Sequence, residues 1–179
     1  MFIYLPWVDP CMGLKKTSEI VAVSFGVTES APNTFTEEQI NLSLDVLNNE
    51  VFVVVAIDLD PGSPDAIAAT DTSTSCQVTS TSKTGNVQLD DSNCLAHTSK
   101  AIRAAGFVDG GVAFTQTGLL TPPANLDYIG IIATDNFFVG INSAGNLAAK
   151  TVNGRVWGYR ARADAATYAG LVQSEVLSA

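Results

Sequence analysis

Two aspartates at alternate positions lead into a glycine turn at Asp58-x-Asp60-x-Gly62, and Asp65 follows closely. Carboxylates in this pattern gather the hard oxygen ligands that a calcium ion prefers. The segment departs from a calcium-binding loop because a proline lies inside it and Ala69 stands where a bidentate glutamate would complete the set. We therefore interpret Asp58 and Asp60 as outward-facing charges that protect the end of a hydrophobic strand, and we assign no metal ligand.

His97 is the only histidine, and the cysteines are Cys11, Cys76 and Cys94. No serine lies in a GxSxG motif and no cysteines form a CxxC pair, so the sequence predicts neither a hydrolase triad nor a zinc site. Cys94 lies three residues before His97 in a segment expected to be helical, which is an unusual place for a catalytic pair. We predict no catalytic residue and no enzymatic activity. Cys76 and Cys94 are expected to be free thiols, with a disulfide between them as the alternative.

Neighbouring carboxylates occur at Glu37-Glu38 and at Asp90-Asp91. Glycoside hydrolases use paired carboxylates, but adjacent residues diverge on a strand and usually act as caps on a helix, so neither pair predicts a catalytic site. Trp157 and Tyr159 share one side of an expected strand. They suit either a sugar-binding face or core packing, and we favour core packing. No glycine-rich phosphate motif is present, so no cofactor is predicted.

The composition favours self-association. Hydrophobic residues make up 46% of the 179 residues and charged residues only 15%, against roughly 25% in ordinary soluble proteins. So few charges leave little polar surface for a dispersed monomer, which predicts a homo-oligomer. The net charge of −9 and the absence of a basic run argue against direct binding to nucleic acid.

The N-terminal residues 1–11 read as an extension of the folded part. They have no positive n-region and their short apolar stretch is broken by Pro6, so they make a poor signal peptide. Met12 followed by Gly13 resembles a translational start, which leaves two candidate starts. No apolar run is long enough to predict a transmembrane helix, and no membrane association is expected.

Residues 40–60 predict a β-hairpin. Apolar and polar residues alternate over 40–46, and Asn48-Asn49 tolerates the left-handed backbone of a tight turn. The segment 51–59 is then apolar on both faces until Asp58 and Asp60 restore the alternation. Such a strand is typical of the middle of a packed sheet. A further strand is expected at 20–25.

The middle of the chain is predicted as a polar loop followed by a helix. Residues 61–86 form the loop, whose Ser/Thr-rich tract at 70–86 suits either a mobile segment or an exposed hairpin; 76–81 favours the hairpin. Asp90 to Ser92 predict the cap of a helix over 93–105.

The last third predicts a meander of four strands and a terminal helix. The strands are expected over 126–133, 137–141, 147–152 and 155–163, with Asn153-Gly154 as a hairpin turn. Asp164 is expected to cap a C-terminal helix over 164–177. The fold class is therefore mainly β: an antiparallel β-sandwich, of which a jelly roll is one form, with one or two short helices. We divide the chain into an N-terminal arm with the first strand, 1–36, and a sandwich domain, 37–179.

In overall character the chain resembles a viral coat or other virion structural protein. It combines apolar strands, an extended arm, an acidic exterior and a Ser/Thr-rich excursion, without a catalytic site. The resemblance implies a self-assembling capsid or coat component of the virion that contacts its own copies and other virion proteins. The alternatives are a secreted or cell-surface β-sandwich that binds carbohydrate or calcium, and a small enzyme built around His97.

Overall fold

The computed structural model describes residues 13–104, 114–117 and 126–177. These residues form two five-stranded antiparallel sheets and a C-terminal helix, so the predicted mainly-β class is confirmed. Residues 1–11 of the predicted arm lie outside this description. The strands are β1 Leu14–Lys16, β2 Val21–Thr28, β3 Thr36–Asn41, β4 Glu50–Pro61, β5 Thr72–Thr79, β6 Cys94–Arg103, β7 Phe114–Thr117, β8 Gly130–Ile132, β9 Asn136–Ala144 and β10 Thr151–Ala163; a 3-10 turn, η1, covers Val46–Asn48, and the helix α1 covers Ala165–Leu177.

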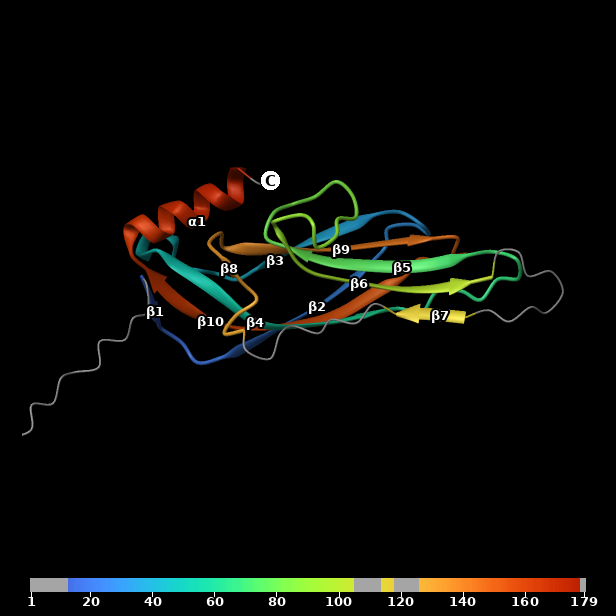
Figure 1. The fold of residues 1–179 in the computed structure, drawn as a ribbon, viewed down its shortest axis with the longest axis horizontal. Helices are drawn as coiled ribbons and strands as arrows, with labels where there is room; N and C mark the ends of the chain where they lie inside the picture. Colours follow the sequence, from blue (N-terminus) through green and yellow to red (C-terminus); the bar gives the residue numbers. More distant parts are fainter. Residues whose placement is uncertain (1–12, 105–113, 118–125, 178–179) are drawn as a thin grey trace, which may run out of the picture.

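Sheet A contains β10 at its centre, with β4 and then β8 on one side and both β1 and β2 on the other. Sheet B has the order β3-β9-β5-β6-β7. Figure 1 shows the two sheets as layers, with α1 at one end of the molecule. The chain repeatedly crosses from one layer to the other. Strands β2, β3, β4 and β5 lie in sheets A, B, A and B in turn, and β8, β9 and β10 lie in A, B and A.

Four antiparallel pairs show how the chain is wound: β2 with β10, β3 with β9, β4 with β8, and β5 with β6. The chain therefore follows the path of one long hairpin, whose first half pairs strand by strand with its second half. Alternate pairs then fall into opposite sheets. This winding is that of a jelly roll, in which two sheets enclose one core.

The core between the sheets is apolar and continuous. Phe52, Phe137, Ile132, Ile141 and Val139 are at most 1% exposed. Phe25 meets Phe137 edge to face, with ring centroids 6.0 Å apart, and so links β2 to β9 across the sandwich. This contact joins two residues that lie 112 positions apart in the chain.

β4 is buried on both faces, as its sequence predicts. Val51 and Val53 lie in a cluster on the outer face of sheet A, while Phe52 and Val54 lie in the core between the sheets. Its central place between β10 and β8 explains why the strand needs apolar residues at consecutive positions.

The predicted hairpin at 40–60 is wrong. β3 and β4 belong to different sheets, and β3 pairs with β9 whereas β4 pairs with β10 and β8. Asn49 does adopt the left-handed conformation, at φ 55°, but it closes η1 at the point where the chain crosses between sheets. The left-handed backbone predicted at Asn48-Asn49 is therefore found at Asn49, but the predicted pairing of the two flanking strands is wrong.

Two further local predictions are wrong. The predicted helix at 93–105 is the strand β6, which pairs with β5 and β7. The predicted polar loop at 61–86 contains β5, which lies between β9 and β6. Thr72, Thr74 and Gln77 on β5 are at most 1% exposed, so this Ser/Thr-rich strand is buried rather than an exposed hairpin.

The predicted meander at 126–163 is also wrong. Asn153 and Gly154 lie inside β10, which continues from Thr151 to Ala163, and the chain changes sheet between β8, β9 and β10. The C-terminal helix is confirmed. Asp164 caps it by accepting a hydrogen bond from the Thr167 N–H at 2.7 Å, and Tyr168, Leu171 and Val172 pack against sheet A.

Candidate functional site

The outer face of sheet A is divided into a covered and an uncovered half. Helix α1 covers the half formed by Val51, Val53 and Ala161, against which Tyr159 and Leu171 also pack. The other half, over the first part of β10 and the last part of β4, holds a depression with a volume of about 380 Å³. It is an open depression on the surface and not an enclosed cavity. We call this depression the sheet A trough.

The strand register fixes the side chains of the trough. Odd-numbered residues of β10 point outward, since Val152 and Val156 lie in the inner core. The resulting rows are Asn153, Arg155 and Trp157 on β10; Asp60, Asp58 and Ala56 directly opposite them on β4; and Gly26, Ser24 and Ala22 opposite them on β2. Polar and aromatic side chains thus occupy the middle row and part of one flank, with small residues beside them.

A β-bulge places the two aspartates on this face. Trp157 pairs with Ala56 and Gly158 pairs with Val54, which leaves Val55 without a partner in β10. The extra residue shifts the alternation of β4 by one position. Without it, Asp58 and Asp60 would point into the apolar core instead of the trough.

The trough holds charges of both signs. Arg155 lies directly opposite Asp58 in the ladder, and its guanidinium lies over the Trp157 ring, 5.7 Å from the centroid. The Arg155 Nε also donates to the Ser24 Oγ at 3.1 Å. Asp60 forms an ion pair of 2.9 Å with Lys100, which reaches across from sheet B. The trough therefore presents charged groups without a large net charge.

Asp65 does not join Asp58 and Asp60. Its carboxylate pairs with Lys150 and accepts a hydrogen bond from the Leu147 N–H at 2.9 Å. The hydrogen bond from Lys150 lowers the pKa of Asp65. Within residues 13–104, 114–117 and 126–177, no group of three histidine, cysteine or acidic side chains is arranged to hold a metal ion.

Among the described residues, His97 does not form a nucleophile–base pair with Cys76 or Cys94. Cys76 and Cys94 are free thiols, and burial raises their pKa values to about 12 and about 11. Burial also lowers the pKa of His97, whose Nε2 lies 3.5 Å from the Asn86 amide. A thiol with a raised pKa is a poor nucleophile at neutral pH.

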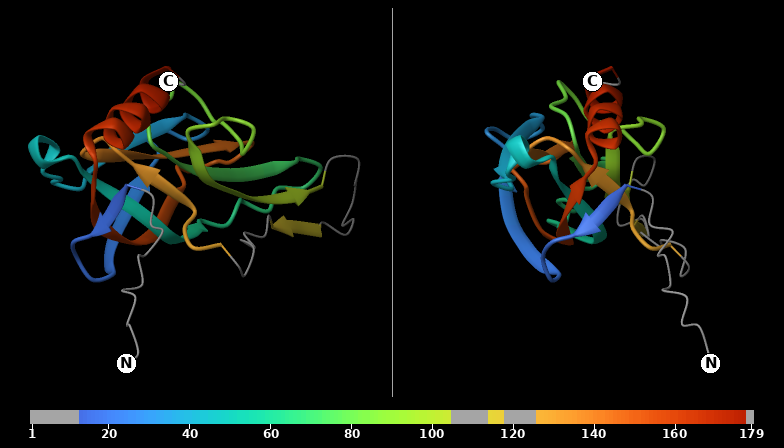
Figure 2. Two further views of the ribbon diagram at one scale, coloured as in Figure 1. Left: turned by 60° about the vertical axis from the view of Figure 1, so that its left-hand side comes forward. Right: turned by 90° about the vertical axis from the view of Figure 1, so that its left-hand side faces the viewer.

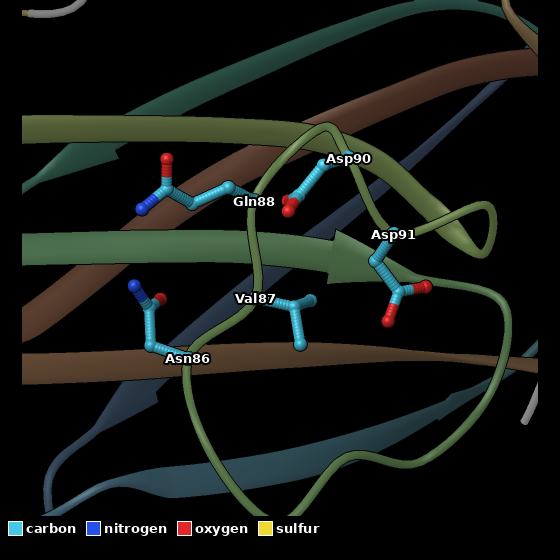
Figure 3. A pocket seen from close by; sticks show the side chains of 5 residues that line it. All are labelled: Asn86, Val87, Gln88, Asp90 and Asp91. Carbon is cyan, nitrogen blue, oxygen red and sulfur yellow. The ribbon is translucent and has the colours of Figure 1, made fainter.

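The acidic pairs serve the loop that crosses the outer face of sheet B. Glu37 accepts hydrogen bonds from the Ser82 hydroxyl at 2.6 Å and from the Lys83 N–H at 2.9 Å. Asp91 forms an ion pair of 3.0 Å with Lys83. Figure 3 shows the loop side chains around a shallow pocket, with Asp90 and Asp91 among them. These contacts tie the loop to β3.

A second pocket lies beneath α1, with a volume of about 220 Å³. Glu175 and Asn93, both buried, line it together with Cys94. Burial raises the pKa of Glu175, while the main-chain N–H groups of Ala133 and Thr134 both donate to its carboxylate at 3.2 Å. These hydrogen bonds fasten α1 to the sandwich, so Glu175 has a structural role.

The sequence groups Asp58 with Asp60, and Trp157 with Tyr159, but it does not predict that the aspartates lie beside Trp157. The structure separates the aromatic pair: Tyr159 packs under α1, as expected for core packing, whereas Trp157 lies in the trough beside the two aspartates. Asn153 and Arg155 were missed. Their alternation with Trp157 would have revealed them had Asn153-Gly154 not been interpreted as a turn.

Comparison with known proteins finds no matching family model, no matching curated protein and no matching solved structure. In the described part of the chain, no helix has the length and apolar character needed to cross a membrane.

Proposed function

We propose that this protein is a structural subunit that assembles with its own copies into the coat or another part of a virion, without catalysis. The jelly-roll winding supports this by analogy, since capsid proteins are among the proteins that use it. The low charged fraction of 15% supports a partly buried surface. Other virion structural proteins are the partners that this proposal implies.

The observation that carries the proposal is the free edge of β2. This strand has eight residues, none of them charged and none of them proline. It pairs with β10 on one side, and no described strand pairs with its other side. Figure 2 shows β2 along one margin of the molecule in the right-hand view. Natural proteins usually protect such an edge with charges, prolines or bulges, or shorten it.

The remaining edge strands do carry such protection. β1, β7 and β8 have three or four residues each, and β3 carries Glu37 and Glu38. β2 is therefore the long, uncharged edge of the described sandwich. Its exposure fits an edge that a strand from another copy covers in an assembly.

The hydrogen-bond pattern indicates which groups of β2 face the free edge. The Glu29 N–H donates to the Lys150 carbonyl, so alternate residues before it, such as Val27, direct their N–H groups toward β10. The N–H groups of Ala22, Ser24 and Gly26 then point to the free edge. A partner strand could add four or more main-chain hydrogen bonds there without displacing β10.

Exposed apolar side chains offer additional contact surface. Leu47 in η1 is 96% exposed and Leu147, before β10, is 80% exposed. The apolar arm at residues 1–11, which lies outside the described residues, is the other contact that the sequence proposes. In this proposal the arm buries its aromatic and aliphatic side chains against a neighbouring copy.

The test is the mass of the purified protein by light scattering, with negative-stain microscopy of the same peak. We expect closed or repeating assemblies of the native chain. Ser24→Pro removes one edge-facing N–H and no bond to β10, so it should shift the mass toward the 18.7 kDa monomer while the circular dichroism spectrum is retained. Ser24→Ala is the matched control, because it removes only the hydroxyl that Arg155 contacts.

Two results would count against the proposal. A native protein that remains an 18.7 kDa monomer across the accessible concentration range would remove the self-assembling role. A Ser24→Pro variant that assembles as fully as the native chain would show that the β2 edge is not the contact.

A further inference from the structure

We propose that the sheet A trough is a binding site for a neutral saccharide, with Trp157 contacting the sugar ring and Asp58, Asn153 and Arg155 binding its hydroxyl groups. This function goes beyond self-assembly and does not depend on it. The site lies on the outer face of the sandwich, so it would remain on the surface of an assembly formed through the β2 edge.

Trp157 is placed where a ligand can reach its ring. The indole is only partly buried, although the same face of sheet A offers a covered apolar half under α1 for Tyr159. The residues directly opposite Trp157 are Ala22 on β2 and Ala56 on β4, so no large side chain stands beside the ring on either neighbouring strand. Because the Arg155 guanidinium lies over the ring, a sugar would contact the part of the Trp157 ring that borders Ala22 and Ala56, where no large side chain competes for the surface.

The charged side chains of the trough indicate the charge of the ligand. The position over the Trp157 ring that a cationic ligand would take is already held by the Arg155 guanidinium. Asp58 lies opposite Arg155, and Asp60 is paired with Lys100. The two carboxylates, Asp58 and Asp60, and the two cations, Arg155 and Lys100, sum to no net formal charge, so the trough favours an uncharged ligand over a cation or an anion.

The polar side chains of the trough can both donate and accept hydrogen bonds. Asp58 only accepts, Arg155 only donates, and Asn153 does both. All three side chains are exposed, and they lie on adjacent rows of the ladder. A sugar hydroxyl both donates and accepts, so neighbouring hydroxyls can bridge a carboxylate and a guanidinium. These three polar side chains can therefore bind the hydroxyl groups of a pyranose while the Trp157 ring contacts its C–H surface.

The trough is built on rigid elements of the fold. The trough residues lie on the long central strands β4 and β10, which pair from Glu50 to Pro61, and not on loops. Arg155 is held by Ser24 as well as by Trp157, so the side chain is ordered before a ligand arrives. A preformed site loses less conformational entropy on binding. The depression is open rather than enclosed, so a chain of sugars could extend along it.

The experiment is a titration of tryptophan fluorescence in a Trp7→Phe background, which leaves Trp157 as the sole tryptophan. The probes are the neutral oligosaccharides cellobiose, maltose and lactose, each up to about 50 mM, with choline and sialyllactose as charged comparators. Calorimetry repeats each titration with the native chain. We expect saturable binding of at least one neutral oligosaccharide and none of choline.

Substitutions locate the site. Asp58→Asn keeps the size of an exposed side chain and should weaken binding several-fold. Trp157→Ala, followed by calorimetry, should weaken it by at least about tenfold. Asp90→Asn, in the pocket on sheet B, is the matched acidic control and should leave the affinity unchanged. Circular dichroism and melting temperature confirm that each variant is folded.

Three outcomes would overturn the proposal: no saturable response to any of the neutral probes, binding of choline alone, or neutral-sugar binding that survives both Asp58→Asn and Trp157→Ala. None of them bears on assembly, which light scattering measures separately. The failure of the saccharide site and the failure of the structural role are therefore distinguishable.

Discussion

Glu175, near the end of α1, accepts a hydrogen bond at 3.2 Å from the main-chain N–H of Ala133, which follows β8 and lies 42 residues earlier in the chain. The other oxygen of the same carboxylate accepts from the Thr134 N–H. One helical side chain thereby satisfies two main-chain donors that β8 leaves unpaired where it ends. The pair links the C-terminal helix to the edge of sheet A.

Removing this carboxylate should loosen α1. Glu175→Ala leaves buried N–H groups without an acceptor, which costs about 1–3 kcal/mol of unfolding free energy. Chemical denaturation measures the loss, and hydrogen exchange should show it concentrated in α1 and residues 133–134. Glu175→Gln is the control, since its amide oxygen can still accept one bond and should retain part of the stability. Equal losses in the two variants would contradict this role.

The same residue predicts a dependence on pH. Burial raises the pKa of Glu175 in the folded state, so the folded protein binds this proton more tightly than the unfolded chain does. The resulting stabilisation is fully present below the unfolded value of about 4.5 and is lost as the pH rises through the folded pKa. The stability of the native chain relative to Glu175→Gln should therefore increase from pH 7 toward about pH 4.5.

Taking this difference separates Glu175 from other carboxylates that act in the opposite direction. Hydrogen bonds lower the pKa values of Asp65 and Asp164, so their stabilisation is lost as the pH falls through their folded pKa values. Both groups are present in the native chain and in the variant, so they cancel. A difference that stays flat over the same window, measured by urea unfolding, would exclude a raised pKa at Glu175.

Gly158 should not tolerate a side chain. A Cβ atom at this position in β10 would overlap the Phe52 ring and the Val53 carbonyl oxygen of β4. Gly158→Ala is expected to cost at least about 2 kcal/mol in thermal or urea unfolding, because the backbone of β4 must move away from its ladder partner. The matched control is Gly170→Ala in α1, where the new Cβ meets nothing within 4 Å. That change should stabilise the protein by about 0.5–1 kcal/mol, and a similar gain at Gly158 would refute the close packing.

Deleting residues 1–11 tests the proposed arm. The truncated chain keeps all the described strands, so its melting temperature should stay within about 2 °C of the native value. Light scattering should show weaker assembly, because the arm carries Phe2, Ile3, Tyr4, Leu5 and Trp7, whose burial in a neighbour would be lost. Unchanged assembly would remove the arm from the proposed contacts.

Several predictions that depend on local periodicity and capping were confirmed, although the cap predicted at Asp90 to Ser92 precedes the strand β6 and not a helix. The apolar run of β4, the strand nature of β2 and β9, and the Asp164 cap of α1 follow from neighbouring residues. The errors arose where a local pattern had to indicate a distant partner. Asn153-Gly154 has the composition of a tight turn, yet Gly154 pairs with Phe25 on one side and with Leu59 on the other, so both residues lie within the continuous strand β10.

The residues of the sheet A trough were likewise predicted one by one, but their meeting was not. The sequence alone indicates outward aspartates at the end of β4 and an aromatic residue on β10. It does not indicate that they meet, because their partnership depends on a single bulged residue, Val55, that resets the alternation of β4. The bulge is defined by the pairing of β4 with β10, which lies about 100 positions further along the chain.

The sequence by itself determined that this chain forms antiparallel strands around an apolar core and ends in a capped helix. Those properties follow from hydrophobic period and backbone preference, which act over a few residues. Only the tertiary structure decided the jelly-roll pairing, in which Thr28 meets Thr151 across 123 positions, the free edge of β2 and the sheet A trough. Strand pairing is chosen by the joint burial of both sheets, a free energy that belongs to the whole sandwich and not to any one segment.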